Sequence, residues 1–292
     1  MKKCLLIVNS YNEDACRLSS DVDFYLTSKK IFVEKILYSG QNSVFSDYNY
    51  SEADFDADEN KILCAITLGG DGTVLFAARF CSLYGIPIFP INLGQFGFIV
   101  GISSSRWKEE FDDFLEGRFS VAQRSMVRAE VYRGGEKVFS SNALNDVSVT
   151  GKGIARIVSL EVSCNSNALG TFKADGIVIA TATGSTAYSA AAGGPIVDPA
   201  VDALVLSPVC AFSLSNRPLV LPPWSLISVT VLPSRGAEVC VTCDGQSSSE
   251  VCVGDEIRIC KAVESVKLIG CGPDIFYSAL RSKLNWSGGS LA

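Results

Sequence analysis

The chain has 292 residues, of which 48% are apolar and 19% charged, and its formal net charge is −6. This composition predicts one large or two ordinary domains with a substantial core, and it excludes a disordered chain. The acidic balance argues against non-specific binding of nucleic acid, which needs lysine and arginine to neutralise phosphates. The apolar run near Met1 ends at Asn9, too short for a signal peptide, and no stretch has the length of a membrane helix, so we expect a cytoplasmic protein without a membrane partner.

The first third of the chain alternates strand and helix patterns. Strands are predicted over 3–9, 31–38, 62–68 and 88–92, helices over 14–28 and from the glycines after residue 68 to residue 84, and a polar loop over 39–60. This β-α-β alternation predicts an α/β domain with a parallel sheet. Ligands of such sheets bind beyond the carboxyl ends of the strands.

The motif Gly69-Gly70-Asp71-Gly72-Thr73 directly follows the buried strand predicted at 62–68. Glycines let backbone N–H groups approach a ligand, and a helix N-terminus favours phosphate. A polyphosphate repels a carboxylate, so Asp71 indicates a task, either holding Mg²⁺ against the phosphates or taking a proton from an attacking hydroxyl. The motif therefore predicts phosphoryl transfer, with Asp71 as the catalytic residue and Gly69, Gly70, Gly72 and Thr73 as the phosphate-binding residues. The alternative is a tight turn in which Asp71 only caps the helix.

From about residue 119 the pattern changes to short β-branched segments separated by turn residues, which is typical of an all-β domain such as a sandwich. Strands are predicted over 128–132, 137–141, 144–150, 157–164, 171–172, 177–181, 226–232, 238–242 and 257–262. A helix at 275–286 is expected to pack back on the first domain. The predicted domains are thus 1–118 with 275–292, which carries the glycine motif, and 119–274, which is β-rich.

A polar cluster in the β-rich half contains Thr183, Ser185 and Thr186, whose hydroxyls suit phosphate or ribose oxygens. Tyr188 could stack on a purine, and Asp175 lies between alanine and glycine, where little blocks its carboxylate. The alternative is a turn rich in serine and threonine with Tyr188 in the core.

The pair Asn145-Asp146 interrupts an apolar run, and such a buried polar pair must be satisfied. Ribose hydroxyls and an adenine edge would satisfy it, whereas a plain turn or bulge is the alternative. The segment Asp244-Gly245-Gln246 has the same two interpretations, a ligand contact or a plain turn, because it is also a good hairpin turn.

The chain has 11 cysteines and no histidine. The cysteines are scattered through apolar runs, which favours reduced core residues over a disulfide framework. Cys240 and Cys243 form the one CxxC pair, and without a second pair or a histidine we expect no metal held by protein ligands. A general base must therefore be a carboxylate, lysine, tyrosine, cysteine or a chain terminus.

Taken together, these motifs resemble those of the NAD kinases. The glycine motif is shared with phosphofructokinases, diacylglycerol kinases and sphingosine kinases, so it indicates only the class of reaction. The stretch 183–188 with 193–195 resembles the NAD kinases much more specifically, and the motifs at 92–98, 145–146, 214–218 and 244–246 add to it in the order expected for this family.

The resemblance implies an α/β N-terminal domain, a β-rich C-terminal domain, a nucleotide site between them and a homodimer or homotetramer. It implies transfer of a phosphoryl group from ATP, carried with Mg²⁺, or from polyphosphate, to the adenosine 2′-hydroxyl of NAD. By position, Asp71 is the catalytic carboxylate, Asn145 and Asp146 hold the adenosine part and Asp175 helps bind the nicotinamide half. The further residues implied in NAD binding are Phe98, Thr183, Ser185, Thr186, Ala187, Tyr188 and Gln246.

Three positions depart from the family pattern. Asp146 stands where glutamate is common, Ala182 replaces a frequent proline, and the segment at Phe212 lacks the histidine that relatives often carry there. A lipid kinase would share the glycine motif but should offer an apolar or basic surface to a membrane, and a sugar-phosphate kinase would need more arginine or lysine near the motifs. A non-catalytic dinucleotide sensor could dispense with Asp71.

Overall fold

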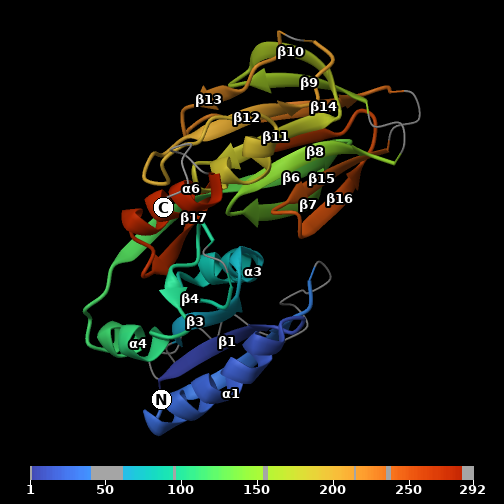
Figure 1. Ribbon diagram of the computed structural model, residues 1–292. Helices are drawn as coiled ribbons and strands as arrows, with labels where there is room; N and C mark the ends of the chain where they lie inside the picture. The colour runs from blue at the N-terminus through green and yellow to red at the C-terminus, as the bar shows by residue number, and fades with distance from the viewer. Residues whose placement is uncertain are drawn as a thin grey trace. The chain divides into compact units, whose positions relative to one another are not determined.

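The computed structural model describes residues 2–40, 62–94, 97–153, 157–213, 215–234 and 238–284 (Figure 1). Most of the loop predicted at 39–60 lies outside these residues, as do Gln95, Phe96 and Leu214 of the family motifs and the end of the helix predicted at 275–286.

The chain divides into two compact units, Met1–Arg124 with Ser265–Ala292, and Ser125–Glu264. The sequence pattern predicted boundaries after 118 and 274, whereas the units change inside two long strands, β6 (Val121–Arg133) and β17 (Glu256–Ile269). Each of these strands belongs to both units, so no turn residue marks the boundary.

The first unit contains a parallel sheet in the order β2-β1-β3-β4, to which the end of β17 adds beside β4. The strands are β1 (Lys3–Asn9), β2 (Phe32–Tyr38), β3 (Ile62–Gly69), β4 (Ile88–Asn92) and the short β5 (Ile102–Ser103) beside β4. All of these pairings are parallel, which confirms the predicted α/β fold.

Helices cover this sheet, as Figure 1 shows for α1 beside β1. They are α1 (Glu13–Ser28), α3 (Asp71–Cys81) with the 3₁₀ turn Ser82–Tyr84, α4 (Trp107–Leu115) and α6 (Pro273–Leu284). Cys4, Leu6 and Val8 of β1 share a buried apolar cluster with α1 and α4. The sequence analysis did not predict α4, whose N-cap residue Arg106 makes no side-chain capping bond, so the usual start signal is missing.

The second unit is an antiparallel sandwich, as predicted. One sheet has the order β13-β12-β11-β8-β15-β16, and the other runs β10-β9-β14-β17-β6-β7. Its remaining strands are β7 (Glu136–Ala143), β8 (Asp146–Lys152), β9 (Val158–Cys164), β10 (Asn167–Ala174), β11 (Gly176–Thr181), β12 (Leu204–Val209), β13 (Leu219–Leu221), β14 (Ile227–Leu232), β15 (Glu238–Cys243) and β16 (Ser247–Val251). Buried valine, leucine and isoleucine side chains from both sheets form one core.

All 11 cysteines are free thiols. Cys4 and Cys64 pair across β1 and β3 with their Sγ atoms 3.8 Å apart, and burial raises the pKa of the Cys64 thiol. Within the described ranges, no helix has the length and hydropathy to cross a membrane, and no three His, Cys, Asp or Glu side chains gather to hold a metal ion.

Candidate active site

Asp71 is the first residue of α3 and follows the carboxyl end of β3 by two residues. The N-cap position belongs to Gly70, whose backbone is extended and which makes no side-chain capping bond. Asp71 therefore does not cap this helix, and the alternative interpretation of the glycine motif is wrong. Its carboxylate remains available for another task.

The Asp71 carboxylate lies against the segment that follows β4. Asp71 Oδ2 accepts a hydrogen bond of 3.2 Å from the Phe98 N–H, while Oδ1 is buried and has no hydrogen-bond partner among the described residues. A Cβ built on Gly97 would lie 1.9 Å from Asp71 Oδ1, so any side chain at that position would displace the carboxylate. Two sequence motifs thus form one site, because β3 and β4 are neighbours in the sheet.

The remainder of the glycine motif provides both open and occupied groups. Gly70 and Gly72 are exposed, so a phosphate can approach the backbone of this first turn. The Thr73 N–H already donates to the Gly70 carbonyl at 3.0 Å. The Thr73 hydroxyl is buried without a partner in the described part of the chain, and a Cβ on Gly69 would lie 2.3 Å from it. Thr73 can therefore bind a ligand through its hydroxyl, whereas its amide is already bonded.

A second group of predicted residues meets at one end of the six-stranded sheet of the second unit. Asp146 begins β8, and Asn145 directly precedes it. A Cβ on Gly184 would lie 2.0 Å from the Asn145 carbonyl oxygen, so the segment around Gly184 packs directly on this pair. Gln246 belongs to the β15–β16 turn, which the pairing of Cys243 with Val147 places beside the start of β8.

The side chains of this pair are buried polar groups. Asp146 is only 6% exposed, and Asn145 Oδ1 is buried with no hydrogen-bond partner among the described residues. Burial and the neighbouring Asp244 carboxylate raise the pKa of Asp146 to about 7, although a hydrogen bond from the Tyr188 backbone acts in the opposite direction. An unsatisfied amide oxygen beside a desolvated carboxyl is typical of a ligand site.

The hydroxyls of Ser185 and Thr186 in the serine and threonine cluster are bonded within the protein. The Ser185 hydroxyl is fully buried, donates to the Ala182 and Val197 carbonyls and accepts from the Val197 N–H. It therefore fixes the turn Thr183–Thr186, within which the Thr186 hydroxyl donates to the Thr183 carbonyl.

Tyr188 is 40% exposed, so the alternative that placed its ring in the core is wrong. It opens the short helix α5 (Tyr188–Ala191), and Ala187 before it is half-buried. The ring can therefore stack on a ligand.

The structure does not bring Asp175 together with this group, and Phe98 is a residue of the other unit. Asp175 precedes Gly176, at the opposite end of β11 from the residue that pairs with Asp146. Five residues of strand separate the two ends, which corresponds to about 17 Å. The half-buried Phe98 belongs to the first unit, where its ring centroid lies 6.2 Å from that of Phe276.

The sequence analysis did not single out Thr181, and it left open whether Asp244 contacts a ligand or only belongs to a turn. Both hydrogen-bond the backbone beside Asn145, at distances of 2.6–3.2 Å. Asp244-Gly245 matches the type I′ hairpin signature, which predicts the turn but not where its carboxylate points.

Comparison with known proteins finds two family models that match this chain. The model of the ATP-NAD kinase N-terminal domain matches residues 4–119, and that of the C-terminal domain matches residues 144–271. The chain is 44% identical to the NAD kinase of Treponema denticola, over 99% of this chain and 98% of that protein. It is 41% identical to the NAD kinase of Treponema pallidum, over 98% of this chain and 90% of that protein.

Two solved structures share the fold. The yeast NADH kinase complexed with NADH has a TM-score of 0.83 and 24% identity, covering 100% of this chain and 90% of that chain. An NAD kinase from Archaeoglobus fulgidus in complex with ATP has a TM-score of 0.69 and 22% identity, covering 95% and 96%. The family models and the full-length relatives lead to one conclusion: this chain belongs to the NAD kinase family.

Proposed function

We propose that this chain transfers the γ-phosphoryl group of ATP to the adenosine 2′-hydroxyl of NAD, which gives NADP. Membership of the NAD kinase family supports the reaction. The observation that carries the chemistry is the Asp71 carboxylate, in which a backbone N–H holds one oxygen while the other is buried without a partner among the described residues.

Asp71 acts in this proposal on the attacking hydroxyl. Oδ2 stays bonded to the Phe98 N–H and sets the orientation of the group, while Oδ1 accepts the proton that leaves the 2′-hydroxyl. A carboxylate is a weak base. Because the transition state of phosphoryl transfer is loose, the proton leaves the hydroxyl late, and a strong base is not required. Positioning of the hydroxyl therefore supplies most of the acceleration.

The donor phosphates would bind at the first turn of α3, beside the exposed Gly70 and Gly72. The Thr73 hydroxyl, which has no partner among the described residues, fits as an oxygen ligand of the magnesium ion that ATP carries on its phosphates, and Asp71 Oδ1 is left for the proton. When bound, such an ion neutralises charge on the phosphoryl oxygens. Gly69 leaves room for the Thr73 hydroxyl.

The second unit holds NAD in this proposal. Asp146 accepts hydrogen bonds from ribose hydroxyls in its ionised form, the Asn145 amide pairs with polar atoms of the adenosine, and the Tyr188 ring stacks on the base. Ser185 supports the turn through its own hydrogen bonds. Further contacts to the dinucleotide are proposed for Phe98, Asp175, Thr183, Thr186, Ala187 and Gln246.

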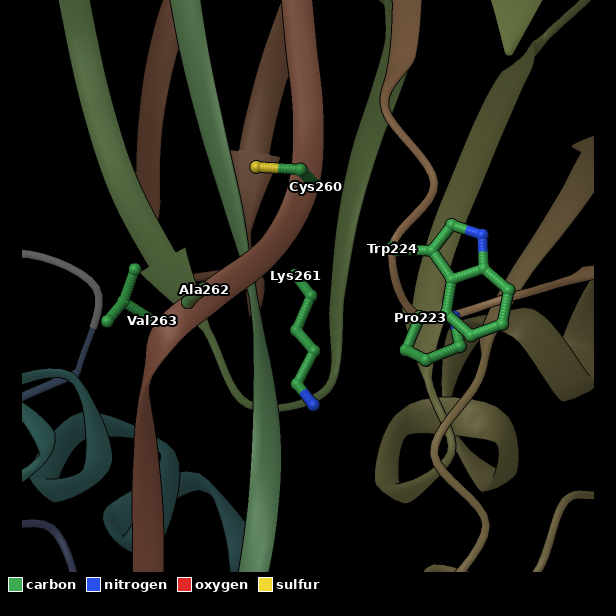
Figure 2. Close-up of a pocket in the computed structure, with 6 residues that line it drawn as sticks. All are labelled: Pro223, Trp224, Cys260, Lys261, Ala262 and Val263. Atoms are coloured by element: carbon green, nitrogen blue, oxygen red, sulfur yellow. The ribbon is translucent and has the colours of Figure 1, made fainter. Parts of the chain in front are cut away.

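We also propose a homodimer or homotetramer, as the family resemblance implies. An open groove of about 410 Å³ in the second unit is lined by Pro223, Trp224, Cys260, Lys261, Ala262 and Val263 (Figure 2). Trp224 is 78% exposed and Val263 is 93% exposed, a large apolar area for a surface. A second copy that covers this groove would bury both side chains.

Light scattering coupled to gel filtration tests the assembly. Trp224→Asp combined with Val263→Asp should lower the measured mass, because two charges cannot enter an apolar interface without cost. Leu83→Asp is a control, since Leu83 is 55% exposed but lies in the first unit. An unchanged mass for the double variant would reject this groove as the interface.

A substrate panel tests the function itself. The protein is incubated with Mg-ATP or polyphosphate and with NAD, NADH, diacylglycerol or fructose 6-phosphate, and the phosphorylated products are identified. We expect NADP from NAD. Phosphatidic acid or fructose bisphosphate would identify a different kinase, and NAD binding without turnover would identify a sensor.

A further inference from the structure

The backbone of residues 144–146 is held by the carboxylate of Asp244, which comes from a segment almost 100 residues further along the chain. Asp244 Oδ2 accepts from the Leu144 N–H at 2.8 Å, and Oδ1 accepts from the N–H groups of Asn145 at 2.7 Å and Asp146 at 3.2 Å. The Asp244 N–H in turn donates to the Asp146 carbonyl at 2.9 Å. One carboxylate thus binds three consecutive amides.

Thr181 holds the same segment through its carbonyl groups. Its hydroxyl donates to the Leu144 carbonyl at 2.6 Å, and its N–H donates to the Asn145 carbonyl at 2.9 Å. The same hydroxyl accepts from the Gly184 N–H at 3.1 Å. Donors and acceptors of residues 144–145 are therefore both bonded, and we call this arrangement the 144–146 clamp.

The hairpin turn does not explain why position 244 carries a carboxylate. Asp244 and Gly245 have φ of 53° and 65°, and the Gln246 N–H donates to the Cys243 carbonyl at 3.0 Å, which is a two-residue turn with positive φ. Asparagine or glycine would serve that turn equally well. A carboxylate has only acceptors, however, so it can bind three N–H groups, whereas an amide would turn a donor toward one of them. Asp244 is 8% exposed, and burying its charge is unfavourable unless those bonds form.

We propose that Asp244 is a positioning residue for the phosphoryl transfer, because it fixes the backbone from which Asn145 and Asp146 present their side chains to NAD. This inference rests on the proposed role of that pair in NAD binding. The 144–146 clamp holds the pair in place before the substrate arrives, so that NAD binding does not have to order the segment.

The charge of Asp244 also acts on the Asp146 carboxyl. Burial and Asp244 raise the pKa of Asp146, while the hydrogen bond from the Tyr188 backbone lowers it. Neutralising residue 244 removes the charge repulsion that disfavours the ionised form of Asp146, so the pH at which Asp146 ionises should fall. A structural carboxylate that does not act on Asp146 would leave that pH unchanged.

The test compares Asp244→Asn with Asp255→Asn in the full-length protein. Asp255 is a matched control, since it is a 2% exposed carboxylate of the second unit that binds the Cys252 N–H and Arg133. Asp244→Asn should lower kcat/KM for NAD about tenfold or more, as expected when buried bonds to a charged group are lost, and leave KM for ATP within about twofold. It should also move the acidic midpoint of the kcat/KM profile to lower pH. Asp255→Asn should change neither quantity for NAD.

Asn145→Ala separates failure of this inference from failure of the proposed function. If Asn145→Ala raises KM for NAD but Asp244→Asn behaves like Asp255→Asn, the positioning role is wrong and the NAD site stands. If Asn145→Ala leaves KM for NAD unchanged, the proposed role of the pair in binding is wrong.

Hydrogen exchange of the unmodified protein keeps the inference testable if Asp244→Asn does not fold. The amides of Leu144, Asn145 and Asp146 should be protected as strongly as the central amides of β8 without any ligand. Exchange at the rate of an unstructured peptide would overturn the 144–146 clamp.

Discussion

Two groups of predicted residues, one in each unit, hold their carboxylates in different ways. Asp71 is half-buried, has one oxygen bonded to a backbone N–H and keeps the other without a partner among the described residues. Asp146 is almost fully buried, and its pKa is raised by burial and a second carboxylate. Under the proposed function, the first arrangement orients an oxygen for chemistry, whereas the second makes binding of NAD depend on ionisation.

The largest effect is expected from removing the charge of Asp71. Asp71→Asn keeps the shape but loses the proton acceptor, and general base catalysis typically contributes about 10²–10⁴-fold, so kcat should fall by that factor. KM for NAD should change little, since the NAD-binding residues of the second unit are intact. Steady-state kinetics measure both, and near-normal turnover would reject the base role.

A smaller loss is expected from crowding the same carboxylate. Gly97→Ala places a methyl group where Asp71 Oδ1 now lies, 1.9 Å from the built Cβ, so the carboxylate must move. A displacement of about 1 Å at a catalytic group can cost about 10²-fold in kcat.

Gly94→Ala is the matched control for this variant, because its built Cβ has no neighbour within 4 Å among the described residues. Equal kinetics for the two alanine variants would show that close packing on Asp71 is not needed for turnover.

Loss of the aromatic ring at position 188 should weaken NAD binding by a smaller factor. Tyr188→Ala removes a stack that is worth about 1–3 kcal/mol, which corresponds to roughly a 5–150-fold rise in Kd for NAD. Tyr188→Phe should bind nearly normally. Calorimetric titration measures both, and equal losses in the two variants would assign the effect to the hydroxyl.

The last prediction concerns the dependence of stability on pH, with no effect expected on turnover of a bound substrate. The folded protein holds the Asp146 proton up to about pH 7, whereas the unfolded chain releases it near its ordinary pKa of 3.8, so this residue destabilises the fold as pH rises between those values. Asp146→Asn removes that dependence. Between pH 4 and 8 the unmodified protein should lose up to about 4 kcal/mol of unfolding free energy relative to the variant. Urea titrations at several pH values measure the difference, and a constant offset would contradict the raised pKa.

Much of this fold could be predicted from the sequence because the local signals agreed. The strand 3–9 and the strand 88–92 were predicted with the bounds that the structure shows. The strand β12 was missed, since Pro208 interrupts its apolar run and proline usually argues against a strand in the interior of a sheet. The proline is accommodated where β12 pairs with β11.

The site was predicted as a set of residues but not as a set of contacts. The sequence placed Asp71 after a strand, yet its bond to the Phe98 N–H joins residues 27 positions apart. Asp244 reaches Asn145 across 99 positions. Local sequence patterns carry no information on contacts between residues so far apart. The prediction that Ser185 contacts NAD therefore did not account for its hydroxyl, which is already bonded within the protein.

A crystal structure with NAD and a non-hydrolysable ATP analogue tests the central claim most directly. Asp71 Oδ1 should lie within hydrogen-bond distance, about 3 Å, of the adenosine 2′-oxygen, with Oδ2 still bonded to the Phe98 N–H. A complex in which both substrates are bound and both Asp71 oxygens remain far from the 2′-oxygen would contradict the account.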